Sequence, residues 1–465
     1  MNQQTIVGAE ELMRQQEFTA RVRSLAQRPQ TFHIVTMGCQ MNERDSETIA
    51  GMLAEMGLRP EAEREKADLI LYNTCCVREN AENRALGNVI WLKELKKERP
   101  ELLICVGGCM AQEEGMAQRL KAQYPFIDLV FGTHNLHRLP EYLWRVLEKR
   151  QPVVEVLHSD GVIAEGLPQR RASAFSAFVN IMYGCDNFCS YCIVPYVRGR
   201  ERSREPEAVL EECKRLVDLG VQEITLLGQN VNSYRGGGNE FAELLRRVDA
   251  LGVPRIRFMT SHPKDLSEEL IAAYGELAHL MPNLHLPVQA GNDEILRAMN
   301  RRYTRERYLE LIKKLRSAKP DIGLSTDIIV GFPGETLAQF EDTLSLVEAV
   351  RFDSAFTFIY SKRIGTRAAQ LPDDTPAEVK SERIQRLIAL QADISREILT
   401  AQVGRRETVL VESISARDEG WVGGKTPRGH MVNFPGNAGL IGRFVRVEIV
   451  SAGRNTLRGK QITEE

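Results

Sequence analysis

The sequence predicts an α/β protein with three regions: an N-terminal parallel α/β sheet domain, a central partial (β/α)6 barrel and a small C-terminal all-β barrel. Short apolar runs that stop at Gly, Asn or Thr alternate with helical stretches over residues 32–147, and six strand–helix units follow over residues 171–401. Over residues 402–465, short alternating strands with Gly and Pro turns replace the helices. We expect a helical tail over residues 1–31 and a linker over residues 148–170.

Composition places the chain among globular proteins. Its 465 residues exceed one ordinary core, and its 43% hydrophobic and 27% charged residues are typical of soluble domains. The formal net charge of -2 argues against wholesale coating of nucleic acid, but it is compatible with a local basic groove. Because the N-terminus is polar and no run approaches about 18 apolar residues, we expect a cytoplasmic protein without membrane contact. Nothing in the sequence demands more than a monomer.

The expected strands are short apolar runs. In the N-terminal sheet they are Phe32–Gly38, Leu69–Thr74, Leu102–Gly108 and Asp128–Gly132. In the barrel they are Ala177–Met182, Glu223–Leu227, Ile256–Thr260, Leu284–Leu286, Leu324–Val330 and Ala355–Ile359. The helix expected over Pro206–Leu219 has proline in its first turn and Gly220 after its last periodic residue. Strands and helices that alternate in this way form parallel sheets, whose carboxyl strand ends share one edge.

The first cysteine triplet predicts an iron–sulfur site. Cys185, Cys189 and Cys192 have the spacing CxxxCxxC directly after the first expected barrel strand. Three thiolates can hold three irons of a 4Fe–4S cluster, and the fourth iron then stays open for catalysis. A structural zinc site, the alternative, requires four ligands, and His262 and His285 lie far along the chain. In a cytosolic protein, disulfides are the less common use of such cysteines.

A second triplet is dispersed along the chain. Cys39, Cys75 and Cys109 each follow an expected strand of the N-terminal sheet. Because those strand ends share one edge, we expect the three thiols to converge and to hold a second cluster with an open iron. The alternative is three buried cysteines, which are common in proteins.

The remaining cysteines are predicted to be ordinary thiols. Cys105 lies inside an apolar strand, and Cys213 lies on the apolar stripe of a helix. Cys76 follows Cys75 directly, and adjacent residues of an extended chain face opposite ways. Cys76 is therefore not expected to share a cluster with Cys75.

Long sequence stretches carry a family resemblance. They are "GCDNFCSYCIVPYVRGRERSR", "LLGQNVNSY", "RIRFMTSHP", "LHLPVQAGND" and "STDIIVGFPGET". With the second cysteine triplet, they resemble the methylthiotransferase family of radical S-adenosylmethionine enzymes, in particular its branch that acts on isopentenylated adenosine in tRNA. The resemblance runs from about Phe32 to the end of the chain, and the last segment resembles the RNA-binding TRAM module.

The resemblance implies a reaction with two 4Fe–4S clusters and two S-adenosylmethionine molecules per turnover. One molecule methylates sulfur held at the N-terminal cluster. The other is cleaved to a 5′-deoxyadenosyl radical, which abstracts hydrogen from carbon 2 of N6-isopentenyladenosine beside the anticodon. A tRNA anticodon stem-loop, a reducing electron donor and a sulfur donor are the implied partners. Open alternatives are sister enzymes that modify threonylcarbamoyl-adenosine in tRNA or a ribosomal aspartate, and a non-enzymatic RNA-binding iron–sulfur protein.

Residues after the barrel strands are candidates for cofactor contact. Polar amides at a strand's carboxyl end face the mouth of a barrel, although turn chemistry is an alternative role. The resemblance places an aromatic residue in the cysteine loop and a glycine motif near adenine. The candidates are Tyr191, Gly228, Gln229, Asn230, Gln289, Val330, Gly331 and Phe332.

Basic residues gather in two arginine-rich runs and at the C-terminal end. The runs are "VRGRERSR", which holds Arg198 and Arg200, and "RRYTRER", which begins at Arg301. Residues 402–465 hold ten Lys or Arg and seven Asp or Glu, a net charge of +3. Charge runs are usually solvated faces, but near a site that admits RNA they fit phosphate contact. The candidates in the last region are Lys425, Arg428 and Arg443, with Trp421 and Phe434 for base stacking, and a core position is the alternative for Trp421.

Overall fold

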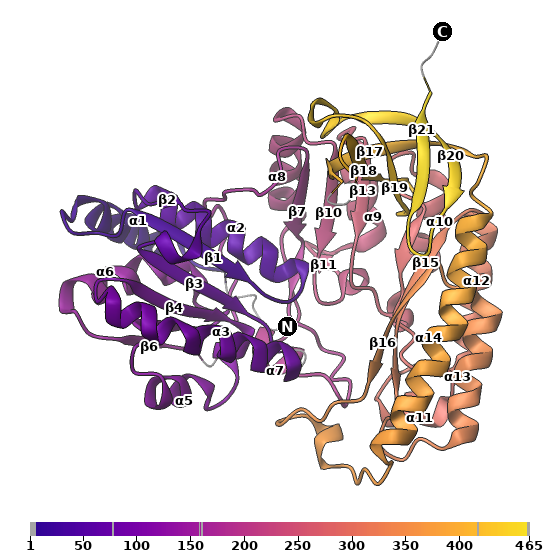
Figure 1. Ribbon diagram of the computed structural model, residues 1–465, viewed down its shortest axis with the longest axis horizontal. Coiled ribbons are helices and arrows are strands. Elements are labelled where there is room, and N and C mark those ends of the chain that lie inside the picture. Colours follow the sequence, from indigo (N-terminus) through magenta and orange to yellow (C-terminus); the bar gives the residue numbers. More distant parts are fainter. Residues whose placement is uncertain (1–5, 77–78, 158, 160, 416–417, 463–465) are drawn as a thin grey trace.

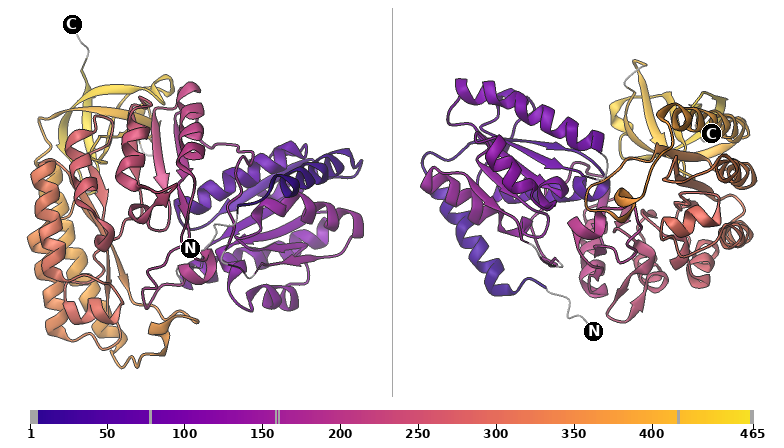
Figure 2. Two further views of the ribbon diagram at one scale, coloured as in Figure 1. Left: turned by 180° about the vertical axis from the view of Figure 1, so that it is seen from behind. Right: turned by 90° about the horizontal axis from the view of Figure 1, so that it is seen from below.

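The computed structural model describes residues 6–76, 79–157, 159, 161–415 and 418–462. The N-terminal α/β region lies beside the central partial barrel, and the C-terminal barrel sits on one end of the central one (Figure 1; Figure 2). In the described part of the chain, no helix has the length and apolar character that a membrane crossing requires.

The N-terminal region is built on one parallel sheet with the strand order β2-β1-β3-β4-β5-β6. The strands are β1 (Thr31–Thr36), β2 (Arg59–Pro60), β3 (Leu69–Thr74), β4 (Leu103–Gly108), β5 (Leu129–Phe131) and β6 (Val153–Glu155). The helices are α1 (Ala9–Ser24), α2 (Gln40–Glu55), α3 (Glu79–Glu98), α4 (Cys109–Gln112), α5 (Met116–Gln123) and α6 (Leu139–Lys149). The four expected strands are present, and β6 extends the sheet from within the segment expected to be a linker.

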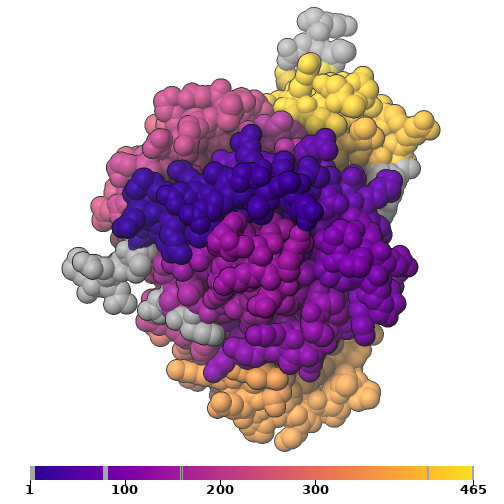
Figure 3. Space-filling view, turned by 90° about the vertical axis from the view of Figure 1, so that its left-hand side faces the viewer, coloured from indigo at the N-terminus to yellow at the C-terminus, as the bar shows by residue number. Residues whose placement is uncertain are grey.

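Alternation along the central strands builds a core on each face of this sheet. Ile70 and Tyr72 of β3 pack with α3, α4 and α5, whereas Leu69 and Leu71 pack with α1, α2 and α6. Both faces are covered, so β3 and β4 are buried along their whole length, as parallel strands between helices are. The first helix, α1, lies across the outer face of the region (Figure 3), where Phe18 contacts Trp144 at a ring-centroid distance of 5.3 Å.

The central region has six parallel strands in two groups, β13-β10-β7 and β14-β15-β16, joined by a bridge between Ile256 and Leu280. The strands are β7 (Ser176–Asn180), β10 (Glu223–Leu227), β13 (Arg255–Phe258), β14 (Asn283–His285), β15 (Gly323–Val330) and β16 (Ser354–Ile359). The helices are α7 (Val194–Arg198), α8 (Pro206–Asp218), α9 (Phe241–Asp249), α10 (Glu268–Glu276), α11 (Asp293–Ala298), α12 (Arg305–Ala318), α13 (Leu337–Val350) and α14 (Ala377–Thr400). The longer helices form the outer layer (Figure 1). The prediction of a partial (β/α)6 barrel is therefore confirmed.

The C-terminal region is a closed barrel with the strand order β17-β18-β19-β21-β20. Its strands are β17 (Arg406–Ile414), β18 (Trp421–Lys425), β19 (Met431–Pro435), β20 (Phe444–Ala452) and β21 (Leu457–Gln461). Phe434 is fully buried in its core, so the expectation that this ring stacks on RNA bases is wrong. Trp421 is half-buried, and the Arg458 guanidinium lies 5.0 Å from its ring centroid.

Candidate functional site

Three neighbouring strands of the N-terminal sheet present the second cysteine triplet at one edge. Cys39 precedes α2 just after β1, Cys75 directly follows β3, and Cys109 is the first residue of α4 after β4. A Cβ atom on Gly38, whose φ is +110°, would lie 2.6 Å from the Cβ of Cys75. Glycine therefore lets the loops after β1 and β3 approach each other closely.

A buried asparagine holds this edge together. Asn42 donates from its side chain to the carbonyl oxygens of Met37 (2.7 Å) and Thr74 (3.0 Å). Its Oδ1 atom lies 3.8 Å from Cys109 Sγ, within hydrogen-bonding reach of the thiol. Nothing in the sequence singled out Asn42 as a site residue, although it lies in the same stretch as Cys39, "TMGCQMNE".

Cys76 is closer to the triplet than expected. It is fully buried in the same core as Cys109. The neighbouring Cys109 thiol and burial raise the pKa of Cys76. The Cys76 thiol, together with the charge of Arg198, outweighs burial and lowers the pKa of Cys109. Cys105 and Cys213 are fully buried core residues, as expected.

The first triplet lies in a loop that a short antiparallel pair closes. Strands β8 (Met182–Tyr183) and β9 (Arg202–Ser203) pair before and after the loop. The Gly184 amide donates to Gln229 Oε1, and a Cβ atom on Gly184 would lie 2.0 Å from the Arg200 carbonyl oxygen. The Cys192 amide donates to the Cys189 carbonyl oxygen (2.9 Å). Burial raises the pKa of both Cys185 and Cys192.

Neither triplet forms a site for a single metal ion. Among the described residues, no three or more His, Cys, Asp or Glu side chains are close enough to hold one ion. A 4Fe–4S cluster makes a different demand, because each cysteine binds its own iron. Three thiols supply the donor atoms that such a cluster takes.

The buried Arg301 stands next to the cysteine loop. Its Nη1 atom donates to Cys189 Sγ (3.5 Å), and its Nη2 atom donates to the Pro287 carbonyl oxygen (2.7 Å). Tyr303 donates to the Val288 carbonyl oxygen (2.7 Å) and contacts the same guanidinium. The suggestion that Arg301 contacts RNA phosphate is therefore wrong, because its charge faces the thiol inside the protein.

The cofactor candidates divide into groups with different environments. Gln229 holds Gly184, and Asn230 Nδ2 donates to Asp265 Oδ2 (2.8 Å). Both amides are thus engaged within the barrel. Gly228 lies against Met182, and a Cβ there would be 2.5 Å from its Cγ.

Gln289 has a strained backbone at the mouth of the barrel. Its φ of +69° is uncommon for a residue with a side chain, and such strain often marks functional sites. Gln289 forms an isolated parallel β-bridge with Ile328 on β15. At the end of β15, Val330 and Phe332 are fully buried, while Tyr191 is half-buried. Gly331 has a φ of +66°, and its amide donates to Glu335 Oε2 (2.7 Å).

Comparison with known proteins now places the chain in a family. Residues 179–347 match the radical SAM superfamily, residues 31–132 the uncharacterized protein family UPF0004, and residues 400–462 the TRAM domain. A tRNA-2-methylthio-N(6)-dimethylallyladenosine synthase of Clostridium botulinum (strain Langeland) is 52% identical over 93% of this chain and 97% of its own length. One of the same name from Acetivibrio thermocellus is 49% identical over 97% of each chain. The chain belongs to the tRNA-2-methylthio-N(6)-dimethylallyladenosine synthase family.

The protein is therefore a radical S-adenosylmethionine methylthiotransferase, a class that carries a 4Fe–4S cluster and uses S-adenosylmethionine. Solved structures share its fold at low sequence identity. The methyltransferase TsrM from Kitasatospora setae has a TM-score of 0.52 and 16% identity over 84% of this chain and 81% of its own. The cobalamin-dependent enzyme OxsB has a TM-score of 0.50 and 13% identity over 78% and 56%.

Arg198 lies inside the protein, contrary to what its sequence suggested. The residue was expected to contact RNA, but its side chain is 7% exposed. Its Nη2 atom lies 2.7 Å from Asp45 Oδ2 and donates to Asn42 Oδ1 (2.6 Å), and its Nε atom donates to Cys109 Sγ (3.2 Å). Arg198 thus joins the barrel to the N-terminal cysteine edge.

The other basic candidates have mixed environments. Arg200 is exposed, pairs with Asp186 at 3.2 Å and lies over the Phe188 ring. Arg443 is exposed, and half-buried Lys425 pairs with Glu412 at 3.1 Å.

The expectation that Arg428 contacts RNA is also wrong. Its Nε donates to Asp353 Oδ1 (2.6 Å), and its Nη1 donates to Asp321 Oδ1 (3.1 Å). These ion pairs dock the C-terminal barrel on the central one, so the guanidinium is not available to RNA in this arrangement.

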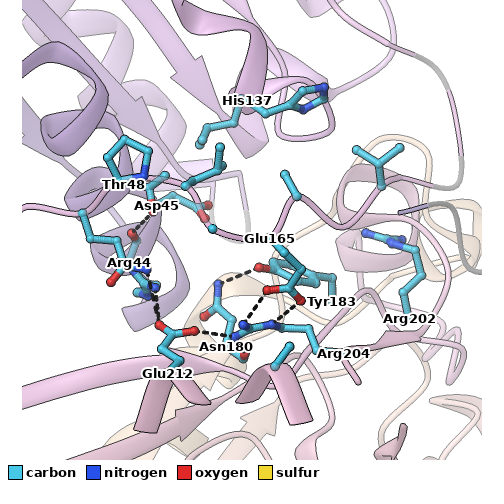
Figure 4. Close-up of a pocket in the computed structure, with 18 of the residues that line it drawn as sticks. Arg44, Asp45, Thr48, His137, Glu165, Asn180, Tyr183, Arg202, Arg204 and Glu212 are labelled. Atoms are coloured by element: carbon cyan, nitrogen blue, oxygen red, sulfur yellow. Dashed lines mark hydrogen bonds and ion pairs between the residues drawn. The ribbon is translucent and has the colours of Figure 1, made fainter. Parts of the chain in front are cut away.

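Two large cavities flank the N-terminal end of α2. The lumen cavity (about 700 Å³) lies inside the partial barrel, and residues of all three regions line it, including Glu43, Phe356 and Arg454. The interdomain cavity (about 680 Å³) lies between the N-terminal region and the start of the barrel, and Arg44 and Arg204 line it (Figure 4). No described residue lines both cavities.

Proposed function

We propose that this enzyme transfers a methylthio group to carbon 2 of N6-isopentenyladenosine next to the anticodon of tRNA. The observation that carries the proposal is the connection between the two cysteine edges. Ile193, which directly precedes α7, and Val197 of α7 pack in the same core as Cys76 and Cys109. Helix α7 starts two residues after Cys192. Both triplets therefore belong to one continuous packed unit, as joint action on one substrate requires.

Each triplet holds one 4Fe–4S cluster in this proposal. Cys185, Cys189 and Cys192 bind the cluster of the radical chemistry, and Cys39, Cys75 and Cys109 bind the second. The bound clusters supply one-electron reduction of S-adenosylmethionine and a site for the sulfur that is transferred.

The chain's own side chains shape and polarise both sites. Arg301 and Arg198 place a positive charge beside one cysteine of each triplet, Cys189 and Cys109. Such charges stabilise thiolates, the form in which cysteine binds iron. Gln229 fixes the cysteine loop of the barrel through Gly184. Gln289 and the backbone at Gly331 contact S-adenosylmethionine at the barrel mouth.

The lumen cavity receives the target nucleoside. Phe356 on β16 is exposed in the lumen, and the His285 ring meets it at a centroid distance of 6.0 Å. An exposed aromatic ring suits stacking of a nucleobase that has left its RNA stack. Arg454 and Lys425 of the C-terminal barrel line the same cavity and contact the flanking phosphates. In this proposal the enzyme is a cytoplasmic monomer that receives electrons from a reducing donor and sulfur from a sulfur donor.

The direct test uses the cluster-reconstituted enzyme, S-adenosylmethionine, a reductant and an isopentenylated anticodon stem-loop. We expect a methylthio product on that RNA by mass spectrometry. The sister substrates, a threonylcarbamoylated stem-loop and the ribosomal protein, serve as parallel arms. Product on either of them, with none on the isopentenylated RNA, would contradict the proposal.

Iron content tests the two-cluster arrangement separately. We expect roughly eight irons per chain, four per cluster. The Cys185→Ala, Cys189→Ala, Cys192→Ala triple variant should keep about four and lose cleavage of S-adenosylmethionine. The Cys213→Ala variant, which changes a core thiol, is the matched control and should keep all eight. A wild-type value near four would mean that one triplet binds no cluster.

A further inference from the structure

The interdomain cavity has no assigned role, and four separate segments form its three walls. Helix α2 and the loop at residues 133–137 form one wall, residues 162–171 a second, and the segment from β7 to α8 a third. Figure 4 shows an ion-pair chain along its floor, from Arg44 through Glu212 and Arg204 to Glu165. These pairs hold the walls together, so the cavity is part of the folded structure rather than a gap between mobile parts.

The position of α2 separates this cavity from the lumen. Gln40 and Glu43 face the lumen cavity, whereas Arg44, Asp45 and Thr48 face the interdomain cavity. Cys39 directly precedes this helix. The N-terminal cysteine edge therefore has the substrate lumen on one side and a second, independent cavity on the other.

A thin layer of side chains divides the interdomain cavity from a cysteine sulfur. Arg198 and Asp45 both line the cavity and pair with each other at 2.7 Å. On its inner side, Arg198 Nε donates to Cys109 Sγ at 3.2 Å. A rotation of this one guanidinium would connect the cavity to the sulfur.

The cavity carries an excess of positive charge and unused hydrogen-bond donors. Six arginines and four carboxylates line it. Arg44 is only 5% exposed, yet its Nε and Nη1 atoms make no hydrogen bond within the described part of the chain, and the nearest carboxylate oxygen of Glu47 is 4.0 Å from Nη1. Arg171 Nη1 is likewise buried without such a bond among the described residues. Buried donors without partners are costly, so a small anion or water must satisfy them.

We propose that the interdomain cavity binds hydrosulfide and delivers it to the N-terminal cysteine edge past the Arg198–Asp45 pair. The inference rests on the proposed function. One sulfur atom leaves with each methylthio product, so one must arrive for each turnover. The substrate RNA fills the lumen, and the interdomain cavity offers an approach that the RNA does not block. The proposed step is binding and delivery of an anion, and no covalent bond is made in the cavity.

The first test measures how the turnover of the holoenzyme depends on added sodium sulfide. In the Arg171→Gln and Arg215→Gln variants, which change two cavity arginines, we expect the sulfide concentration for half-maximal rate to rise about tenfold, the equivalent of one charge-assisted hydrogen bond. The rate at saturating sulfide should return to the wild-type value. The Arg119→Gln variant, on the exposed surface of α5, is the matched control and should show no change. An unchanged sulfide dependence in both cavity variants would mean that water alone fills the cavity, and would overturn the proposal.

A second test needs no catalysis, so it separates this inference from the proposed function. The full-length, cluster-free chain is treated with anionic iodoacetate or neutral iodoacetamide, and peptide mass spectrometry follows alkylation of Cys109. The measured quantity is the ratio of alkylation by iodoacetate to alkylation by iodoacetamide. We expect this ratio to be higher at Cys109 than at exposed Cys39, and to fall severalfold at Cys109 in the Arg171→Gln variant. A ratio equal at the two cysteines, or unchanged in the variant, would overturn the proposal even if the enzyme makes the expected product.

Discussion

Replacement of Arg198 by methionine tests whether one buried arginine holds the barrel against the N-terminal region. The change keeps an unbranched apolar side chain and removes the guanidinium. It breaks the contacts with Asp45 (2.7 Å), Asn42 (2.6 Å) and Cys109 (3.2 Å). We expect local unfolding of α7 and α2 to become easier, because Asp45 is left buried without its counter-charge.

The size of the effect follows from the burial of the pair. The Arg198 and Asp45 side chains are 7% and 13% exposed, so solvent screens them little. Removal of one partner from a buried pair typically costs about 3–5 kcal/mol. Since Asp45 retains some solvent access, we expect about 3 kcal/mol in the free energy of local unfolding. The Arg198→Met, Asp45→Asn double variant should recover about 1–2 kcal/mol of this, because the stranded charge is gone.

Amide hydrogen exchange in the cluster-free chain is the appropriate assay, since a chain with several regions does not unfold in two states. Protection of α7 and α2 should fall in the single variant and return in part in the double variant. Arg200→Met is the matched control: Arg200 is 46% exposed, and the loss of its pair with Asp186 should cost less than about 1 kcal/mol. A cost below about 1 kcal/mol for Arg198→Met, or no recovery in the double variant, would refute the reasoning.

Three further predictions concern stability. Burial, with a smaller effect of neighbouring Arg138, lowers the pKa of His137 to about 4, so a fall from pH 7 to pH 5 should cost ~1–2 kcal/mol in the free energy of local unfolding of α6, measured by amide hydrogen exchange, and His137→Gln should reduce that loss. A Cβ atom on Gly51 of α2 would lie 2.5 Å from backbone atoms of Pro168, so Gly51→Ala should lower the melting temperature. Gly87→Ala in α3, where an added Cβ atom would have no neighbour within 4 Å apart from its own stretch of the helix, should raise it through about 1 kcal/mol of helix propensity. Asp353→Ala removes the partner of Arg428, so limited proteolysis should release the C-terminal barrel faster than in the wild type.

The central strands of the N-terminal sheet could be predicted from the sequence because burial on both faces favours continuous apolar runs. β3 and β4 read "LILYNT" and "LICVGG" and are buried at every position. The edge strands β2 and β6 were missed because both residues of β2 are exposed and only one residue of β6 is buried, so neither needs a continuous apolar run. Tertiary position, rather than local preference, makes these segments into strands.

The placement of the cysteines could also be predicted, because parallel strands end at one edge. The side chains that contact the cysteines could not be predicted. Arg198 contacts Cys109 across 89 positions of sequence, and nothing in "VRGRERSR" separates a buried arginine from an exposed one. Cys76 was expected to face away from the triplet because neighbouring residues of an extended chain point to opposite sides. Strand β3 ends at Thr74, before Cys75, and Cys76 packs in the same buried core as Cys109.

The barrel contacts the N-terminal region at both ends of its strand order, and this limits how the enzyme can open. At the first strand, α7 carries Arg198 into the N-terminal edge. After the last strand, the buried Arg363 pairs with Glu82 (3.1 Å) and Glu113 (3.4 Å) of the N-terminal region. Separation of the two regions would have to break the contacts at both ends at the same time. We therefore expect the RNA to enter while the two regions stay together. Glu43 of α2 and Arg454 of the C-terminal barrel both line the lumen cavity, and neither takes part in these two contacts, so we expect the RNA to enter on their side.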